Sequence, residues 1–130
     1  MKLDGQAALV TGGASGLGAA TAKALASAKV KVAILDTDIE GGKAIAKEID
    51  GIAIECDVSN EQSGERAIEI ARKNHGPARV LINCAGIGPA ERIVGKTGPM
   101  PLDNFRRVIE INLIGSFNLC LLYTSPSPRD

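Results

Sequence analysis

The sequence is poor in several residue types, and each shortage argues against a class of protein. Only three residues are aromatic, Phe105, Phe117 and Tyr123, too few for base-stacking platforms that bind single-stranded nucleic acid. The 15 basic residues are balanced by 15 acidic ones, so no positive excess attracts nucleic acid or an anionic membrane. No apolar run approaches the about 18 residues of a membrane span, and the N-terminus lacks the apolar stretch of a signal peptide.

Cysteine is also scarce, and its pattern is uninformative for metals. Cys56, Cys84 and Cys120 are odd in number, widely spaced and without a C-x-x-C pair, so we predict neither a disulfide framework nor a metal site. Reduced thiols are the simplest interpretation and favour a cytoplasmic protein. With 45% hydrophobic and 23% charged residues, the chain has the composition of a globular domain with a core of its own.

The chain does contain a regular alternation of short apolar runs and amphipathic stretches. The apolar runs predict strands over 6–11, 30–35, 52–56 and 79–83, and the stretches between them predict helices over 16–28, 38–49 and 60–74. A further helix is expected from about Leu102, after a loop rich in glycine and proline. Strands that are apolar throughout are buried on both faces, so we predict an α/β fold with a doubly wound parallel sheet of Rossmann type.

Helical spacing also predicts which side chains face the sheet. In the first helix the predicted inner stripe is Leu17, Thr21, Ala24, Leu25 and Ala28. In the last helix one face carries Phe105, Val108, Ile109, Asn112, Leu113, Ser116, Phe117 and Cys120. Asn112 lies in the middle of that apolar face, and a buried amide without partners would cost about 1–3 kcal/mol, so we expect it to be hydrogen-bonded.

The sharpest motif is Thr11-Gly12-Gly13-Ala14-Ser15-Gly16-Leu17-Gly18, between the first strand and the first helix. Glycines there permit positive φ, approach of backbone N–H groups to a pyrophosphate, and close packing of the helix on the strand. The helix N-terminus is partly positive, and no acidic residue from Thr11 to Lys31 would repel a phosphate. A plain glycine-rich turn is the alternative, but the context favours a phosphate loop in which Gly12, Gly16 and Gly18 are spaced G-x-x-x-G-x-G.

Asp36 closes the second predicted strand, 18 residues after Gly18. A carboxylate there can accept hydrogen bonds from both ribose hydroxyls of NAD, each worth about 1.5–3 kcal/mol, and would repel the 2′-phosphate of NADP. No arginine lies near the glycine loop or Asp36 in the sequence to offset that repulsion, so NAD is the expected cofactor. Alternatively, Asp36 opens a turn or caps the next helix, although Asp38 is better placed as the cap.

These residues resemble the short-chain dehydrogenase/reductase family, whose glycine motif is T-G-x-x-x-G-x-G. Asp57-Val58 follows the third strand, where the family has an aspartate that reaches the adenine. Asn83-Cys84-Ala85-Gly86 follows the fourth strand and resembles the family's N-N-A-G, with Cys84 in place of the second asparagine. Asn112, within I-N-L-I-G, matches the helix asparagine of the catalytic tetrad. From the residues alone, Asp57 could instead be a turn residue and Asn112 a satisfied core amide.

The resemblance covers residues 3–119 and implies an NAD-dependent oxidoreductase that acts on a secondary alcohol or ketone. Residues 98–105 and the loop before them look most like type II 3-hydroxyacyl-CoA dehydrogenases, which implies a 3-hydroxyacyl-CoA substrate. The resemblance also implies that Asn112 holds a water beside the catalytic lysine and that the complete enzyme is a homodimer or homotetramer. The residues implied to contact or line the cofactor, beyond the three glycines, are Ser15, Leu17, Asp36, Asp57, Val58, Asn83, Cys84, Ala85 and Gly86.

The family's catalytic Ser and Tyr-x-x-x-Lys have no counterpart in the sequence, since Tyr123 is the single tyrosine and no lysine follows Lys96. We therefore expect residues 1–123 to be an NAD-binding half-domain, truncated after the fourth strand and its following helix and inactive alone. Residues 124–130 contain two prolines and are interpreted as a non-native tail, with a genuine disordered terminus as the alternative. Such a fragment would expose residues 79–83 as an apolar edge strand and would be marginally stable.

Two other functions remain open at this point. A non-catalytic NAD-binding module would carry the same cofactor residues. A methyltransferase also uses a glycine-rich loop and an acidic residue at a strand end, but the Asn83–Gly86 and Asn112 motifs argue against it. Binding of S-adenosylmethionine in place of NADH would support the methyltransferase.

Overall fold

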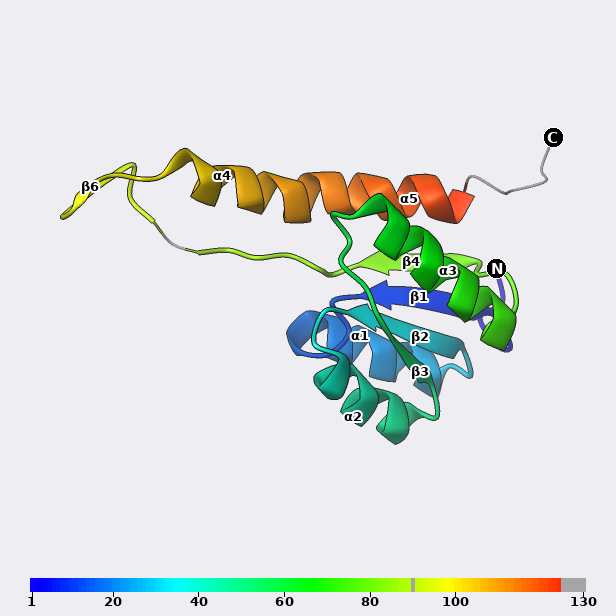
Figure 1. Cartoon of the computed structure of the whole chain (residues 1–130). Coiled ribbons are helices and arrows are strands. Elements are labelled where there is room, and N and C mark those ends of the chain that lie inside the picture. Colours follow the sequence, from blue (N-terminus) through cyan, green and yellow to red (C-terminus); the bar gives the residue numbers. More distant parts are fainter. Residues whose placement is uncertain (90, 125–130) are drawn as a thin grey trace.

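The computed structural model describes residues 1–89 and 91–124, and its centre is a four-stranded parallel sheet (Figure 1). The strands are β1 (Ala7–Thr11), β2 (Lys31–Asp36), β3 (Ile52–Glu55) and β4 (Val80–Asn83), in the order β3-β2-β1-β4. All strands run parallel, and the order in which they are added along the sheet reverses at β1, which is the arrangement of a doubly wound α/β fold. The predicted fold class and all four strands are confirmed.

The helices cover both faces of this sheet. α1 (Gly16–Ser27) and α2 (Ile39–Ile49) lie on one face, whereas α3 (Glu61–His75) and α5 (Gly115–Thr124) lie on the other (Figure 1). α5 continues a long helical segment that begins with α4 (Leu102–Ile109) and passes through a π-helical turn, η1 (Glu110–Ile114); α4 and η1 together are called the α4 arm. A small hairpin of β5 (Val94–Gly95) and β6 (Gly98–Pro99) lies at the far end of the α4 arm (Figure 1).

The core consists of two apolar layers, one on each face of the sheet. All five residues of β1 are buried, because this strand lies between two others and beneath helices on both sides. Leu9 and Leu35 belong to the layer under α3 and α5, whereas Val10 and Ile34 belong to the layer under α1 and α2. The register pairs Thr11 with Leu35 on one side and with Asn83 on the other, which brings the carboxyl ends of the strands to one edge.

The predicted inner stripe of α1 is only partly confirmed: Leu25 and Ala28 pack against the core, whereas Leu17 and Ala24 are exposed. Leu17 is 83% exposed, and the buried residues of α1 are Gly18, Ala19 and Ala22. The helix packs on its smallest residues because these allow its backbone to lie close to the sheet, whereas the larger Leu17 is left at the rim of the first turn. In α3, helical spacing predicts that Ala67, Ile70 and Ala71 face inward; Ala67 and Ala71 are buried, together with Gly64, whereas Ile70 is 39% exposed.

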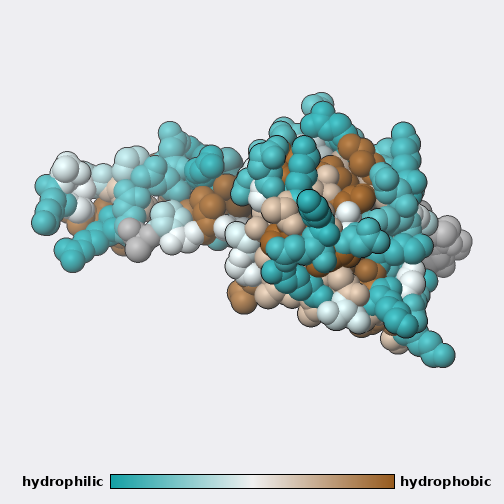
Figure 2. Space-filling view, turned by 90° about the horizontal axis from the view of Figure 1, so that it is seen from below, coloured by the Kyte–Doolittle hydropathy of each residue, from teal (hydrophilic) through white to brown (hydrophobic). Residues whose placement is uncertain are grey.

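The apolar face predicted for the last helix is also largely exposed. Phe105, Leu113 and Phe117 are 53%, 64% and 65% exposed, and the buried residues of α5 are Gly115, Asn118 and Leu119. The prediction chose the inner face of this helix by its apolar content alone, and this choice was wrong. In this structure the stripe with small and amide residues packs against α3 and the loop before it. The view from below shows apolar patches that interrupt the polar surface on that side of the molecule as well (Figure 2).

Within the described residues, no helix is long and apolar enough to cross a membrane. Among the same residues β4 pairs only with β1, so β4 forms an edge of the sheet as expected. Of the predicted tail 124–130, only Thr124 is described, as the last residue of α5, and the rest lies outside the described residues.

Candidate functional site

The carboxyl ends of all four central strands open onto one cleft of about 500 Å³. Four chain segments form its walls, each following a different strand, and they are joined by residues from the α4 arm. Every predicted cofactor-binding residue except Asn83 lines this cleft; they are Gly12, Ser15, Gly16, Leu17, Gly18, Asp36, Asp57, Val58, Cys84, Ala85 and Gly86. Ligands of doubly wound sheets bind at this edge, at the point where the strand order reverses.

The glycine loop forms the floor of the cleft, and its glycines have distinct geometric roles. Gly12 and Gly16 adopt positive φ angles of 67° and 54°. A Cβ on Gly12 would lie 2.7 Å from the backbone nitrogen of Ala85, and a Cβ on Gly18 would lie 2.0 Å from the Gly12 carbonyl oxygen. A Cβ on Gly16 would meet nothing within 4 Å. The loop is therefore closed beneath by backbone and open above, as a cradle for a phosphate requires.

The N-terminus of α1 provides the positive electrostatic potential that an anion needs. Ser15 is its N-cap, and the first turn contains no acidic residue, as the sequence predicts. Within the described residues, the Ser15 side chain accepts no capping hydrogen bond from α1. Ser15 and the first turn of α1 line the cleft, where the Ser15 hydroxyl and the free N–H groups of the helix can donate to a pyrophosphate.

Asp36 joins the end of β2 to the glycine loop. Its Oδ2 accepts a hydrogen bond of 3.0 Å from the Ala14 N–H, and its Oδ1 accepts one of 2.9 Å from the Asp38 N–H. Each oxygen retains lone pairs for a ligand, because a carboxylate offers about four acceptor positions. Asp38 is the N-cap of α2 and accepts from the Gly41 N–H at 3.0 Å, as predicted, whereas the bond from the Asp38 N–H gives Asp36 the turn role that was its alternative.

Thr11 supports the site from below, a role that the sequence did not reveal. It is fully buried, and its Oγ1 accepts hydrogen bonds of 3.1 Å from the N–H groups of both Cys84 and Ala85. The one sequence feature that could have indicated this role is that Thr11 is a polar residue at the end of an otherwise apolar strand. Thr11 thus ties the loop after β4 to the end of β1, directly under the glycine loop.

Replacing Thr11 with valine should therefore destabilise the chain. Valine keeps the shape but removes the acceptor, which leaves the Ala85 N–H unsatisfied at a cost of about 1–2 kcal/mol in unfolding free energy, measurable by urea denaturation. Thr21→Val is a matched control, because the Thr21 hydroxyl bonds only to the Leu17 carbonyl within α1. Its effect should stay within about 0.5 kcal/mol, and equal losses in the two variants would refute this role of Thr11.

The loop after β3 forms the wall opposite the β4 loop. The Asp57 side chain accepts from the Ser59 N–H at 3.0 Å and from its hydroxyl at 2.6 Å, which is the turn role left open by the sequence. Asp57 also lines the cleft, so the turn presents its carboxylate there. Beneath it, burial raises the pKa of the Cys56 thiol to about 11, the nearby Asp57 carboxylate contributing to the increase, so Cys56 stays protonated at neutral pH.

The loop after β4 is fixed by the last helical segment. The Asn112 Oδ1 accepts from the Ile87 N–H at 2.8 Å, and its Nδ2 donates to the Ile87 carbonyl at 2.8 Å. Asn112 is exposed rather than buried as predicted, but its amide has the partners that were expected. It lies in the π-helical turn η1, a feature that is frequent at functional sites. Asn83 lies outside the cleft lining, and its amide donates to the Cys120 Sγ at 3.5 Å.

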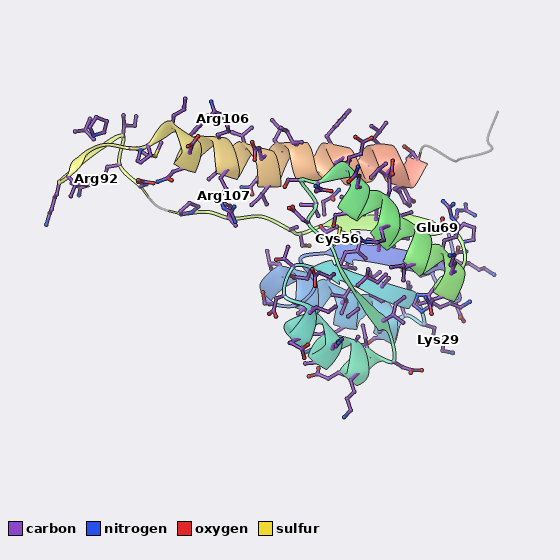
Figure 3. The ribbon with its side chains drawn as sticks, in the orientation of Figure 1. Lys29, Cys56, Glu69, Arg92, Arg106 and Arg107 are labelled. Carbon is purple, nitrogen blue, oxygen red and sulfur yellow. The ribbon has the colours of Figure 1, made fainter. Side chains whose placement is uncertain are left out.

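Two charged residues of the α4 arm, Arg107 and Glu110, also line the cleft and were missed in the sequence. Figure 3 shows Arg107 on the side of α4 that faces the loop after β4, and Arg106 on the opposite side. Arg106 pairs with Asp103 at 2.7 Å, whereas Arg107 also lines a second, neighbouring pocket of about 550 Å³ with Ile87, Gly88, Pro89, Glu91 and Asn104. Their positions depend on how the arm packs, which the sequence pattern does not specify.

Tyr123 lies at the opposite edge of the sheet. It lines a cavity of about 490 Å³ at the amino ends of the strands, together with His75 and Arg79. Burial lowers the pKa of His75, and the positive charge of Lys31 lowers it further. Among the described residues, no cluster of three or more His, Cys, Asp or Glu side chains could hold a metal ion.

Comparison with known proteins agrees with this geometry. A family model described as short chain dehydrogenase matches residues 6–126. The chain belongs to the short-chain dehydrogenase family. Human 3-hydroxyacyl-CoA dehydrogenase type-2 is 37% identical over 122 residues, which are 91% of this chain and 47% of that protein. The chain thus spans about half the length of the curated short-chain dehydrogenases that it matches.

Solved structures show the same likeness. A hydroxysteroid dehydrogenase from Escherichia coli superimposes with a TM-score of 0.86 at 29% identity, over 95% of this chain and 53% of that one. A structure described as ribose-5-phosphate isomerase from Brucella melitensis 16M superimposes with a TM-score of 0.85 at 32% identity, over 95% and 46%. Because these names differ in reaction, likeness of fold alone does not determine the chemistry, and the function must be argued from the site.

Proposed function

We propose that this chain forms the NAD(H)-binding part of a short-chain dehydrogenase that oxidises a secondary alcohol, with 3-hydroxyacyl-CoA as the substrate class. The observation that carries the proposal is the convergence of four strand ends on one cleft. That cleft combines an anion cradle at the N-terminus of α1 with the Asp36 carboxylate at the end of β2. A dinucleotide needs both features, one for its pyrophosphate and one for its adenosine ribose.

The residues present fit the cofactor in a specific division of roles. Gly12, Ser15, Gly16, Leu17 and Gly18 would hold the pyrophosphate, and Asp36 would accept the hydrogen bonds of the adenosine ribose. The wall with Asp57 and Val58 would contact the adenine. The wall formed by Cys84, Ala85 and Gly86 would lie along the nicotinamide half.

Asp36 also supports the choice of NAD over NADP. Its carboxylate is held in place by two backbone N–H groups, so it cannot turn away from a ligand without losing both bonds. A 2′-phosphate would face this fixed negative charge. Arg107 is a basic residue of the cleft lining, but it lies on the α4 arm beside the loop after β4 rather than on the Asp36 segment.

Bound NAD would supply the hydride acceptor, and the residues of this chain would bind it, orient it and help exclude water. Asn112 would act at the proton-transfer end. Its amide is fixed by Ile87, and its Oδ1 retains a lone pair that could hold a water, as the family resemblance implies. The neighbouring pocket beside Ile87 and Arg107 would receive part of the substrate. We also propose that the complete enzyme is a homodimer or homotetramer, with the exposed face of Phe105, Leu113 and Phe117 at its interface.

The test is a fluorescence titration of the 130-residue chain with NADH and with NADPH. We expect NADH to bind at least about tenfold more tightly, because one lost charge-assisted hydrogen bond costs about 1.5–3 kcal/mol. Equal affinities would contradict the choice of NAD, and binding of S-adenosylmethionine without NADH would contradict the dehydrogenase itself. Binding of NADH by the chain would be equally compatible with a non-catalytic NAD-binding module, which only an assay of turnover separates from a dehydrogenase.

A further inference from the structure

α5 contacts the loop after β3 through a buried asparagine that no cofactor motif includes. Asn118 is 8% exposed, and its Nδ2 donates to the Val58 carbonyl at 2.8 Å and to the Asn60 carbonyl at 3.3 Å. Both acceptors belong to the segment that forms one wall of the cleft or adjoins it. A single side chain of the helix therefore bonds to two backbone carbonyls of that loop, two residues apart.

Two glycines, Gly115 on α5 and Gly64 on α3, allow α5 to pack closely against the loop after β3 and the start of α3. A Cβ on Gly115 would lie 2.5 Å from the Val58 Cγ2, and a Cβ on Gly64 would lie 2.8 Å from the Leu122 Cδ1 and 3.2 Å from the Asn118 Nδ2. The helix thus packs directly on the loop backbone and on the start of α3. The position of the loop follows the position of the helix, because there is little free space between them.

Hydrogen bonds within the loop link its residues to one another and to the start of α3. The Asp57 N–H donates to the Ser63 Oγ at 2.9 Å, and the Asn60 side chain caps α3 by accepting from the Ser63 N–H at 2.8 Å. The turn at Asp57 is closed by Ser59. A contact at Val58 and Asn60 therefore determines where the Asp57 carboxylate lies.

The same helical segment holds the other wall through Asn112, six residues earlier, which bonds to both backbone groups of Ile87. From this arrangement we infer that Asn118 is a positioning residue, which works with Asn112 to set the separation of the two cleft walls and so orders the adenine wall in advance of ligand binding. The inference rests on the proposed function for the identity of the ligand. The claim that Asn118 fixes the position of the loop after β3 does not depend on that function.

Asn118→Leu tests this role, because leucine has nearly the same size and no donor. ADP-ribose carries the adenine half of the cofactor, and we expect its affinity to fall about tenfold, as when only a tenth of the molecules have the wall in place. The affinity for reduced nicotinamide mononucleotide, which does not reach that wall, should stay unchanged. Hydrogen exchange at the Ser59 and Ser63 amides should become faster, since both bonds depend on an ordered loop.

Ile49→Ala is the control, because Ile49 is the last residue of α2 and packs against the core layer on the opposite face of the sheet. It should lower stability without changing either affinity or the exchange at Ser59 and Ser63. If Asn118→Leu fails to fold, Gly115→Ala displaces Val58 from the same helix and should give the same split between the two ligands. Equal losses for both ligands, or the same result in the control, would overturn the inference.

The two proposals fail in different ways. If the unmodified chain binds neither ADP-ribose nor NADH, the proposed function is wrong and the exchange measurement alone decides the role of Asn118. If it binds both and Asn118→Leu leaves exchange and ADP-ribose affinity unchanged, the proposed function stands and the positioning role is wrong.

Discussion

Gly18→Ala should nearly abolish NADH binding and strongly destabilise the chain. The added methyl would lie 2.0 Å from the Gly12 carbonyl oxygen and 2.6 Å from its carbonyl carbon, so backbone rather than a flexible side chain must shift. Overpacking of this kind costs about 3 kcal/mol of unfolding free energy. The displaced loop would also lose its N–H groups from the pyrophosphate position, which should weaken NADH binding by roughly 100-fold.

Gly88→Ala provides the comparison for Gly18→Ala. A Cβ on Gly88 would meet nothing within 4 Å, and Gly88 lies outside the lining of the cofactor cleft. Its unfolding midpoint in urea and its NADH affinity should match those of the unmodified chain. If Gly18→Ala bound NADH as tightly as Gly88→Ala does, the close approach of α1 to the glycine loop would not matter for the site.

Asp36→Ala should weaken NADH binding by about 10- to 100-fold, which corresponds to one or two lost charge-assisted hydrogen bonds. The affinity for NADPH should stay the same or increase, because a fixed negative charge facing the 2′-phosphate is removed. The ratio of the two affinities, measured by fluorescence titration, should therefore approach one. The Ala14 N–H also loses its acceptor at 3.0 Å, so the glycine loop should become less ordered.

Asp38→Ala separates this local effect from a general change of charge. It removes the same charge two residues away, but Asp38 caps α2 and does not line the cleft. The loss of the cap should cost about 1 kcal/mol of stability and leave the preference for NADH in place. A preference that survives in Asp36→Ala, or that disappears equally in Asp38→Ala, would mean that Asp36 does not select the cofactor.

The strands and the cleft could be predicted because their signals are local. β1 and β2 are uninterrupted apolar runs, and the residues that follow a parallel strand must gather at its carboxyl edge. Asp36 and Asp38 could be assigned separate roles, since a cap is defined by its distance from the helix start. The glycine motif predicted a close backbone approach, which the structure shows at Gly12 and Gly18.

The faces of the helices could not be predicted as well, because hydrophobicity does not measure how closely two backbones pack. Leu17, in the first turn of α1, is exposed although it is large and apolar, whereas the small residues Ala19 and Ala22 are buried. The role of Asn118 could not be predicted either. It is a polar residue in an apolar helix, and its hydrogen-bond partners lie about 60 residues earlier in the chain. Thr11 and Arg107 likewise depend on segments that meet only in the folded chain.

The most direct test of the central claim is an amide NMR spectrum of the 130-residue chain, recorded during titration with NADH. If the cleft binds NAD, the largest shift changes will occur at residues 12–18, at Asp36, at residues 57–58 and at residues 84–87. The cavity at the amino ends of the strands, around His75 and Arg79, should remain unchanged. Changes centred on that cavity, or none at saturating NADH, would contradict the account.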